Sequence, residues 1–151
     1  MIRLRAARTQ ELPDLSELCL RSKAVWGYDK KFLEACRREL ELHEEDLDSS
    51  HIAVAEARGH IIGIAQIKVE KFEAHLLKMF VEPTWLRSGV GSLLFTWACE
   101  EARANDAISL FIESDPGAAP FYRRMGAHDV GYAPSGSIPG RVLPKLVYDL
   151  T

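Results

Sequence analysis

Two glycines separated by one residue, Gly89 and Gly91, form the most suggestive feature of this chain. They lie between a segment with strand character and a segment with helical periodicity. Glycine lets backbone N–H groups approach an anion closely, and the first turn of a helix adds the positive end of its dipole. A pyrophosphate is the natural ligand of such a turn. Two glycines alone are equally compatible with a tight strand-to-helix connection that binds nothing.

Two known anion-binding loops fit this turn poorly. The phosphate loop of NTPases requires Gly-Lys-Ser/Thr, a tripeptide that this sequence lacks. The dinucleotide fingerprint requires a third glycine at the position of Leu94, and its glycine unit opens the domain instead of following a hairpin. Glu113 nevertheless follows the turn at a distance suited to a ribose contact. A small NAD-binding oxidoreductase therefore stays an alternative.

Other reactive residue types show no arrangement that predicts a site. The five histidines lack the spacing of metal ligands, and the three cysteines form no Cys-x-x-Cys pair. We expect these cysteines to be buried thiols in a reducing compartment. Ser137 lies in Gly-Ser-Ile-Pro-Gly, which does not match the Gly-x-Ser-x-Gly of serine hydrolases. The sequence predicts no metal centre and no serine nucleophile.

The length of 151 residues predicts a single domain, residues 1–151. The chain is 47% hydrophobic and 27% charged, and 19 Lys+Arg against 22 Asp+Glu leave a net charge of −3. This balance argues against a nucleic-acid partner, which favours a basic protein. The charged N-terminus is not a signal peptide, and no apolar run reaches the ~20 residues of a membrane span. We therefore expect a cytoplasmic protein with no membrane partner.

Strands and helices are expected to alternate around the glycine turn. Helices are predicted from Thr9, from Asp29, directly after the glycine turn, and from Asp115-Pro116 to Gly126. A tight hairpin is predicted at Arg58-Gly59. The predicted strands are 2–7, 51–57, 60–69, 74–81, 107–112 and 143–150. This order indicates an α/β (α+β) domain built on a mixed sheet.

The segment from Met79 to Gly91 resembles the acyl-CoA signature of the GNAT N-acetyltransferase superfamily. In that family, Gln/Arg-x-x-Gly-x-Gly/Ala follows a strand that ends in Val-x-Pro, and this chain has Val81-Glu82-Pro83 before its glycine turn. Leu86 occupies the Gln/Arg position, and an arginine follows at Arg87. Because backbone amides supply most of the phosphate contacts, we expect the departure to weaken the match without breaking it.

A second block, residues 115–126, is similar to the family's helix Asn-x-x-Ala-x-x-Phe-Tyr-x-x-x-Gly-Phe. Ala118, Phe121, Tyr122 and Gly126 match the pattern, while Asp115 stands for the Asn and Ala127 for the final Phe. The two blocks occur in the family's order with one strand between them. Together with the preceding elements, the resemblance covers essentially the whole chain.

The resemblance implies a single GNAT-like domain with a central mixed, mostly antiparallel sheet that is flanked by helices and splayed at the acyl-CoA site. Acetyl-CoA would be the co-substrate, no metal would be needed, and the partner would be an amine acceptor. Pantetheine would pair with backbone groups of Met79 and Val81 in the gap. The pyrophosphate would bind the amides of residues 88–92. The implied cofactor-binding residues are Met79, Phe80, Val81, Arg87, Ser88, Gly89, Val90, Gly91, Ser92, Asp115, Phe121 and Arg124.

The same resemblance implies direct transfer of an acetyl group to a primary amine, with Tyr122 as general acid for the departing thiolate. A tyrosine that only packs beside Phe121 is the structural alternative. His75 stands where many family members have a glutamate, and strand alternation predicts that His75 shares one face with Met79 and Val81. A neutral histidine suits a general base, directly or through water. Glu113 is the alternative base.

The acceptor site of this family is formed by the first two helices and the loop before the last strand. Here those segments carry Trp26 and Tyr28, an acidic run from Glu39 to Asp48, and Arg141, which we expect to bind substrate. Pairing of Arg141 with a carboxylate would indicate an amino-acid-like acceptor. The alternatives to an enzyme are a non-catalytic acyl-CoA sensor and the oxidoreductase. The sequence is compatible with a monomer or a homodimer.

Overall fold

The first half of the sheet is an antiparallel meander. The structure is a computed structural model that describes residues 1–151. It contains β1 (Ile2–Ala6), β2 (His51–Ala57), β3 (His60–Glu70) and β4 (Glu73–Val81), each antiparallel to its neighbour. Arg58 and Gly59 join β2 to β3 with φ values of 53° and 78°. Two successive left-handed residues are the geometry of a tight hairpin turn, so the predicted hairpin is confirmed.

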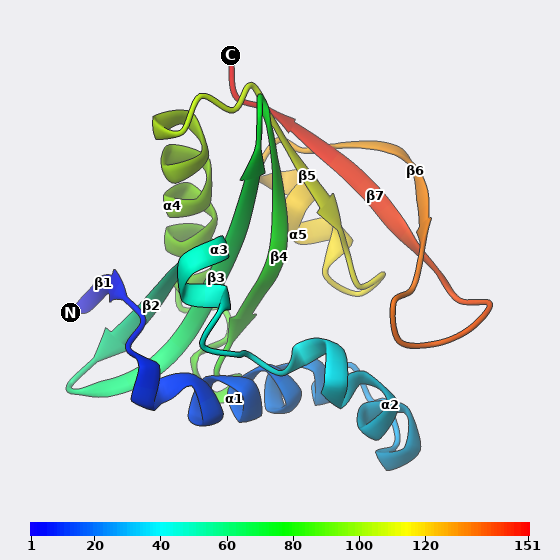
Figure 1. Cartoon of the computed structure of the whole chain (residues 1–151). Helices are drawn as coiled ribbons and strands as arrows, with labels where there is room; N and C mark the ends of the chain where they lie inside the picture. The colour runs from blue at the N-terminus through cyan, green and yellow to red at the C-terminus, as the bar shows by residue number, and fades with distance from the viewer.

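The second half of the sheet reverses the strand order. β5 (Ser109–Glu113) runs parallel to β4, and β7 (Val142–Asp149) lies between β5 and the edge strand β6 (His128–Pro134). The complete order is β1-β2-β3-β4-β5-β7-β6, and only the β4–β5 pair is parallel (Figure 1). The predicted mixed, mostly antiparallel sheet is confirmed.

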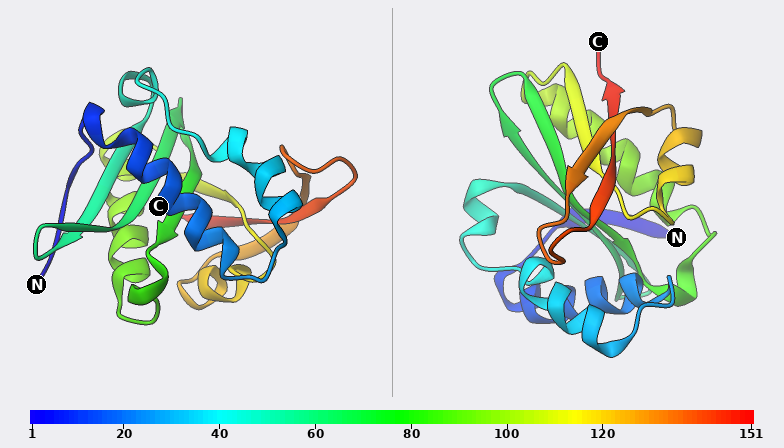
Figure 2. Two further views of the ribbon diagram at one scale, coloured as in Figure 1. Left: turned by 90° about the horizontal axis from the view of Figure 1, so that it is seen from below. Right: turned by 90° about the vertical axis from the view of Figure 1, so that its right-hand side faces the viewer.

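Helices cover both faces of the sheet. One face carries α1 (Leu12–Ala24), α2 (Lys30–Leu40) and the short α3 (Asp46–Ser49), and the other carries α4 (Val90–Ala104) and α5 (Ala119–Arg124) (Figures 1 and 2). Two 3-10 turns, η1 (Thr9–Glu11) and η2 (Pro83–Trp85), precede α1 and α4. No helix combines the length and the apolar character needed to cross a membrane.

The helix starts follow local capping in one case and depart from it in another. The Asp29 carboxylate accepts a hydrogen bond of 2.8 Å from the Phe32 N–H, so α2 begins where the sequence predicts. The last helix does not begin at Asp115-Pro116, because that carboxylate accepts from the Gly117 N–H and closes a turn. Regular helix begins at Ala119. Gly126 ends the helix with φ 108°, as predicted.

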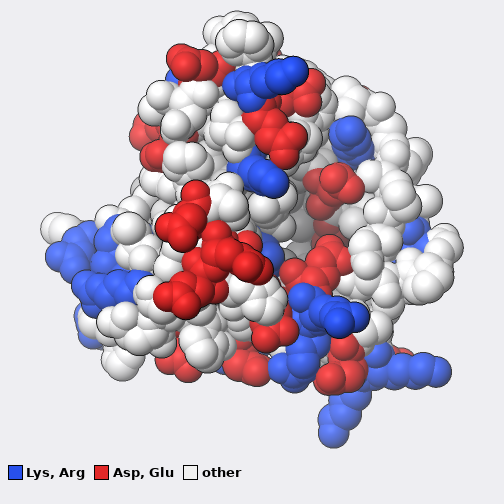
Figure 3. All heavy atoms as spheres, in the orientation of Figure 1, with Lys and Arg blue, Asp and Glu red and all other residues white.

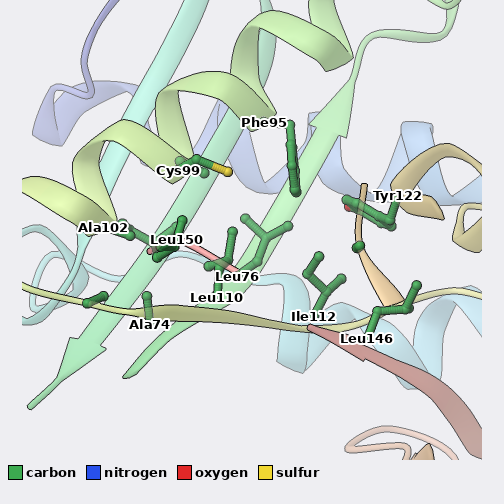
Figure 4. Close-up of a cluster of buried hydrophobic side chains, with 14 of the residues drawn as sticks. Ala74, Leu76, Phe95, Cys99, Ala102, Leu110, Ile112, Tyr122, Leu146 and Leu150 are labelled. Carbon is green, nitrogen blue, oxygen red and sulfur yellow. The ribbon is translucent and has the colours of Figure 1, made fainter. Parts of the chain in front are cut away.

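The largest core cluster lies between the sheet and the α4–α5 face. Phe95 of α4 is its largest fully buried side chain, and Tyr122 enters the cluster from α5 (Figure 4). Leu76 of β4, Ile112 of β5 and Leu146 of β7 complete the wall beneath them. Leu76 and Ile112 are also the last paired residues of β4 and β5, so the core meets the sheet where these two strands separate.

Candidate active site

β4 and β5 pair over a short length and then separate. Their parallel register consists of four residue pairs and ends at Leu76 and Ile112, although β4 continues to Val81. A β-bulge lies at the same level: Gln66 of β3 faces Lys78 and Ile67 faces Leu76, which leaves Leu77 without a partner. The β5-facing edge of residues 77–81 is therefore unpaired. We call this gap the β4–β5 opening.

Backbone groups of β4 face the opening. The Val81 N–H points away from β3 and donates to the Ser22 hydroxyl of α1 at 3.3 Å, whereas the next N–H, of Glu82, donates toward β3. Since alternate residues of a strand direct their N–H and C=O groups to the same side, Met79 also presents its backbone polar groups to the opening. These are the positions at which a strand-like ligand would pair. No sequence motif points to Ser22, because its contact depends on how α1 packs on the sheet.

The glycine turn presents a row of unbonded amides. The backbone N–H groups of residues 88–92 donate to no backbone acceptor, and the first bond of α4 runs from the Leu93 N–H to the Gly89 carbonyl. Gly89 has φ 91°, a conformation that glycine adopts freely. No side chain caps this N-terminus, and the turn is exposed. Free amides at the start of a 15-residue helix can accept an anion, so this turn is a candidate anion site.

An arginine and an aromatic ring adjoin these amides. Arg87 lies in the turn itself, whereas Arg124, also expected at the cofactor, is exposed on α5. Arg123 has a bidentate bond to Asp129 at 2.7 and 2.9 Å, which reduces its availability to a ligand. The Phe121 ring lies so close to Gly91 that a Cβ there would touch it at 3.4 Å. α5 thus borders the anion site, with Phe121 against its second glycine.

Tyr122 is buried between the two helices and the sheet. Its ring lies 5.7 Å from that of Phe95 and 5.3 Å from that of Phe121. Burial raises the pKa of its phenol. The hydroxyl makes no side-chain hydrogen bond within the chain, and because no buried side-chain oxygen lacks a partner, this atom reaches solvent. A protonated hydroxyl without an internal acceptor can donate to a ligand, which is compatible with the general-acid role implied by the resemblance.

The structure corrects the predicted face of His75. The bulge at Leu77 inserts one extra residue, so the side chains of Met79 and Val81 face α4 while His75 faces the opposite side of the sheet. There the imidazole stacks on Phe111 of β5, with ring centroids 5.6 Å apart, and is half-exposed. Simple alternation fails because a bulge shifts the pleat by one residue.

Glu113 shares the His75 side of the sheet. It lies two residues after Phe111 on β5, is exposed, and faces Lys145 of β7 in the register. Lys145 itself lies 5.1 Å from the Phe111 ring centre. Both candidate bases thus lie on the side of the sheet away from Tyr122. The β4–β5 opening has candidate bases on one side and the candidate acid on the other.

The expected acceptor segments meet at Asp115. Tyr28 donates to this carboxylate at 2.7 Å and accepts from Arg141 at 2.7 Å, and Lys23 of α1 lies 3.5 Å from the same carboxylate oxygen. Burial, together with the bond to Asp115, raises the pKa of Tyr28 to about 12. Asp115 was expected at the cofactor; its two oxygens are instead engaged by this network and by Gly117. Lys23 was not predicted, and its position in the last turn of α1 is also typical of a lysine that only complements the helix dipole.

Trp26 and the last loop complete the same region. Trp26 is half-exposed and packs on the β5–α5 turn, where a Cβ at Gly117 would lie 2.7 Å from its indole. In the β6–β7 loop, Ser137 donates to Glu39 of α2. Phe80, expected at the cofactor, packs its side chain against the α1–α2 cluster. The structure thus brings Trp26, Tyr28 and Arg141 to one side of the β5–α5 turn, and their role in binding the acceptor stays a prediction.

The comparisons with known proteins match this geometry. The family model described as Acetyltransferase (GNAT) family matches residues 13–127. No curated protein sequence matches the chain. No group of three or more His, Cys, Asp or Glu side chains is arranged to hold a metal ion.

Solved structures share the fold at low identity. The PaiA N-acetyltransferase from Thermoplasma acidophilum, in complex with coenzyme A, has a TM-score of 0.82 at 18% identity, with 99% of each chain covered. An acetyltransferase of the GNAT family from Staphylococcus aureus Mu50 has a TM-score of 0.80 at 17% identity, with 100% of each chain covered. The ribosomal-protein-S18-alanine N-acetyltransferase from Escherichia coli has a TM-score of 0.73 at 19% identity, with 100% of this chain and 95% of that chain covered.

Proposed function

We propose, since this chain belongs to the acetyltransferase (GNAT) family, that it transfers an acetyl group from acetyl-CoA directly to a primary amine of a small molecule or a protein. The observation that carries the proposal is the row of free amides at residues 88–92, which adjoins the unpaired edge of β4. The amides suit a pyrophosphate and the strand edge suits the amide groups of pantetheine. Arg87 lies in the turn and would add a charge contact to the nucleotide, and Arg124, exposed on α5, is a second candidate for such a contact.

The proposed chemistry uses both sides of the β4–β5 opening. Acetyl-CoA supplies an acetyl thioester: the amine nitrogen bonds to the acetyl carbon, and the carbon–sulfur bond breaks. An aliphatic amine with a pKa near ~10.4 must first lose a proton, which costs roughly 4–5 kcal/mol at pH 7. His75 or Glu113 would accept this proton, directly or through water. Tyr122, on the opposite side, would donate its phenolic proton to the sulfur.

The charge on the face of the molecule shown in Figure 3 supports an amine acceptor. Acidic side chains gather over α3 and around a hollow in the middle of this face (Figure 3). A protonated amine is attracted to such a surface. The base candidates lie on the same side of the sheet as α3, so the acceptor would approach from this face.

Ligand binding separates this proposal from its alternatives. Acetyl-CoA or CoA at 100 times its dissociation constant should raise the melting temperature by roughly 5–10 °C, because binding adds about 2.7 kcal/mol to the stability of a domain of this size. Thiol release with a broad panel of amines would then show turnover. A shift with NAD alone would overturn the proposal. A shift with acetyl-CoA, but no thiol release with any amine, would indicate an acyl-CoA sensor.

A charge-insertion variant tests the anion site directly. Gly91→Asp places a carboxylate at the free amides, where it occupies them and repels a pyrophosphate, while an acidic residue in the first turn suits the helix itself. We expect the thermal shift with acetyl-CoA to disappear and the unliganded protein to stay folded. Thr9→Asp is the matched control, since it adds the same charge at an exposed position at the start of η1. An undiminished shift in Gly91→Asp would contradict the assigned site.

A further inference from the structure

Two partly buried cationic side chains next to Asp115, where the segments expected to bind the amine substrate meet, have most of their N–H groups free. The ammonium of Lys23 and the guanidinium of Arg141 offer eight N–H groups between them. Within the chain they make two side-chain hydrogen bonds, from Lys23 to Asp115 at 3.5 Å and from Arg141 to Tyr28 at 2.7 Å. Only 14% of the Lys23 side chain and 19% of the Arg141 side chain are exposed. No buried side-chain nitrogen lacks a partner, so the donors that make no bond within the chain face solvent and are accessible to an external acceptor.

The charges in this cluster do not balance. Asp115 is the one carboxylate within 4 Å of either cation, at 3.5 Å from Lys23 and 3.6 Å from Arg141. Its oxygens already accept from Tyr28 and Gly117. Two positive charges and one negative charge leave a surplus of one positive charge in a partly desolvated position. An external anion would both neutralise this surplus and accept from the free donors.

Two stacked aromatic rings lie against both cations. Tyr28 and Phe32 are stacked with centroids 4.0 Å apart, and each cation lies within 6.0 Å of both ring centres. Cation–π contact holds the two groups side by side without using their N–H donors. The donors thus remain available on the sides that do not face the rings.

The cluster lies next to the reacting centre. Lys23 follows Ser22, whose hydroxyl contacts the Val81 N–H at the β4–β5 opening, and Asp115 follows β5 by two residues. Arg141 belongs to the loop that Ser137 joins to α2. An anion bound by both cations would therefore lie near the residues that border the opening. Side chains that are only 14% and 19% exposed are reached more easily by a compact ligand than by a protein surface.

Building on the proposed function, we propose that Lys23 and Arg141 together bind the carboxylate of the acceptor, so that the substrate is a small amine that also carries a carboxylate, such as an α-amino acid. The carboxylate lies against the two cations, and the amino group extends toward the opening and the base candidates. The acetylated nitrogen loses its charge during transfer, whereas the carboxylate keeps its contacts throughout.

Matched acceptors test this inference. For each of several α-amino acids, the free acid, its carboxamide and the decarboxylated amine are compared by thiol release, at several pH values because the three amines differ in pKa. Loss of a charge-assisted contact should lower kcat/KM by roughly 10- to 100-fold for the carboxamide and the amine. Lys23→Met and Arg141→Gln should each remove most of this preference. Arg37→Gln is the matched control, because Arg37 is paired with Glu17 and Glu34 on the exposed side of α2.

The outcomes distinguish this inference from the proposed function. Equal rates for acid and carboxamide, or a preference that survives in Lys23→Met, would overturn it. The inference would also be overturned if no acid in the panel were acetylated. If a diamine or a peptide N-terminus were acetylated instead, the proposed function would still stand. A protein that shows no thermal shift with acetyl-CoA would contradict the proposed function itself. Should Arg141→Gln not fold, Lys23→Met and the wild-type comparison still decide the question.

Discussion

The Tyr122 hydroxyl allows catalysis and stability to be separated by removing one atom. Tyr122→Phe deletes an oxygen that lies in the aromatic cluster around Phe95 and makes no hydrogen bond inside the chain. The ring and its packing are retained. If Tyr122 donates the proton to the departing thiolate, the variant loses this donor and nothing else.

Catalysis and stability should respond differently. No buried side-chain oxygen lacks a partner, so the Tyr122 hydroxyl atom reaches solvent, and the free energy of unfolding of Tyr122→Phe should change by less than about 1 kcal/mol. The melting temperature should therefore shift by no more than about 4 °C. Loss of a general acid should lower kcat by about 100- to 10,000-fold. Binding of acetyl-CoA should be nearly unaffected, since no contact of the amides at residues 88–92 changes.

The measurement pairs thermal melting with the steady-state rate of thiol release. Tyr148→Phe is the matched control, because the Tyr148 ring contacts the same Phe95 ring, with centroids 5.4 Å apart, and its hydroxyl also has no partner in the chain. Tyr148→Phe should keep its kcat. An unchanged kcat in Tyr122→Phe would refute the assignment of the acid. A marked loss of stability would refute the claim that the hydroxyl has no partner.

Three further predictions follow from individual contacts. Gly117→Ala should destabilise the chain by about 1–3 kcal/mol, because its Cβ would meet the Trp26 indole at 2.7 Å; melting should show this, and the loss should vanish in a Trp26→Ala background. His75→Gln should remove the acid limb of the pH–rate profile if the imidazole is the base, whereas Glu113→Gln should do so if the carboxylate is, and an unmoved limb in both would contradict both assignments. Burial raises the pKa of the Cys19 thiol from 9.0 to about 12, so the unfolded state releases a proton that the native state keeps, and stability falls as pH rises above 9. Urea unfolding should therefore give a free energy of unfolding about 1 kcal/mol lower at pH 10 than at pH 8. If Cys19→Ala lost stability by the same amount, ionisation of the Cys19 thiol would not be the cause.

Local sequence signals predicted much of the fold. The Asp29 cap, the Arg58-Gly59 turn and the terminal Gly126 act through their own backbone and nearest neighbours, and each lies where it was expected. Asp115-Pro116 did not start the last helix at once. That carboxylate satisfies Gly117 and also reaches Tyr28, a residue far away in the sequence, and such a partner cannot be read from local pattern.

The sequence predicted the position of free backbone groups better than the direction of side chains. The free amides of residues 88–92 depend only on a glycine turn that opens a helix, which the sequence shows directly. The direction of His75 depends on the bulge at Leu77, and one extra residue has no signature in the alternation of apolar residues. Lys23 was missed for a different reason, since its neighbours come from two other segments of the chain, residues 28–32 and Asp115.

The short seam between β4 and β5 has a mechanical consequence. Four residue pairs join the meander β1–β4 to the three strands that follow, while the Tyr28–Asp115–Arg141 contacts tie the α1–α2 connection to the far half. When the unliganded protein is pulled mechanically, β4 and β5 should separate first, because few backbone hydrogen bonds join them. An extended ligand bound between β4 and β5 would connect the two halves of the sheet and resist their separation. Pulling experiments with and without coenzyme A should then differ in the force of the first rupture while the later ruptures coincide.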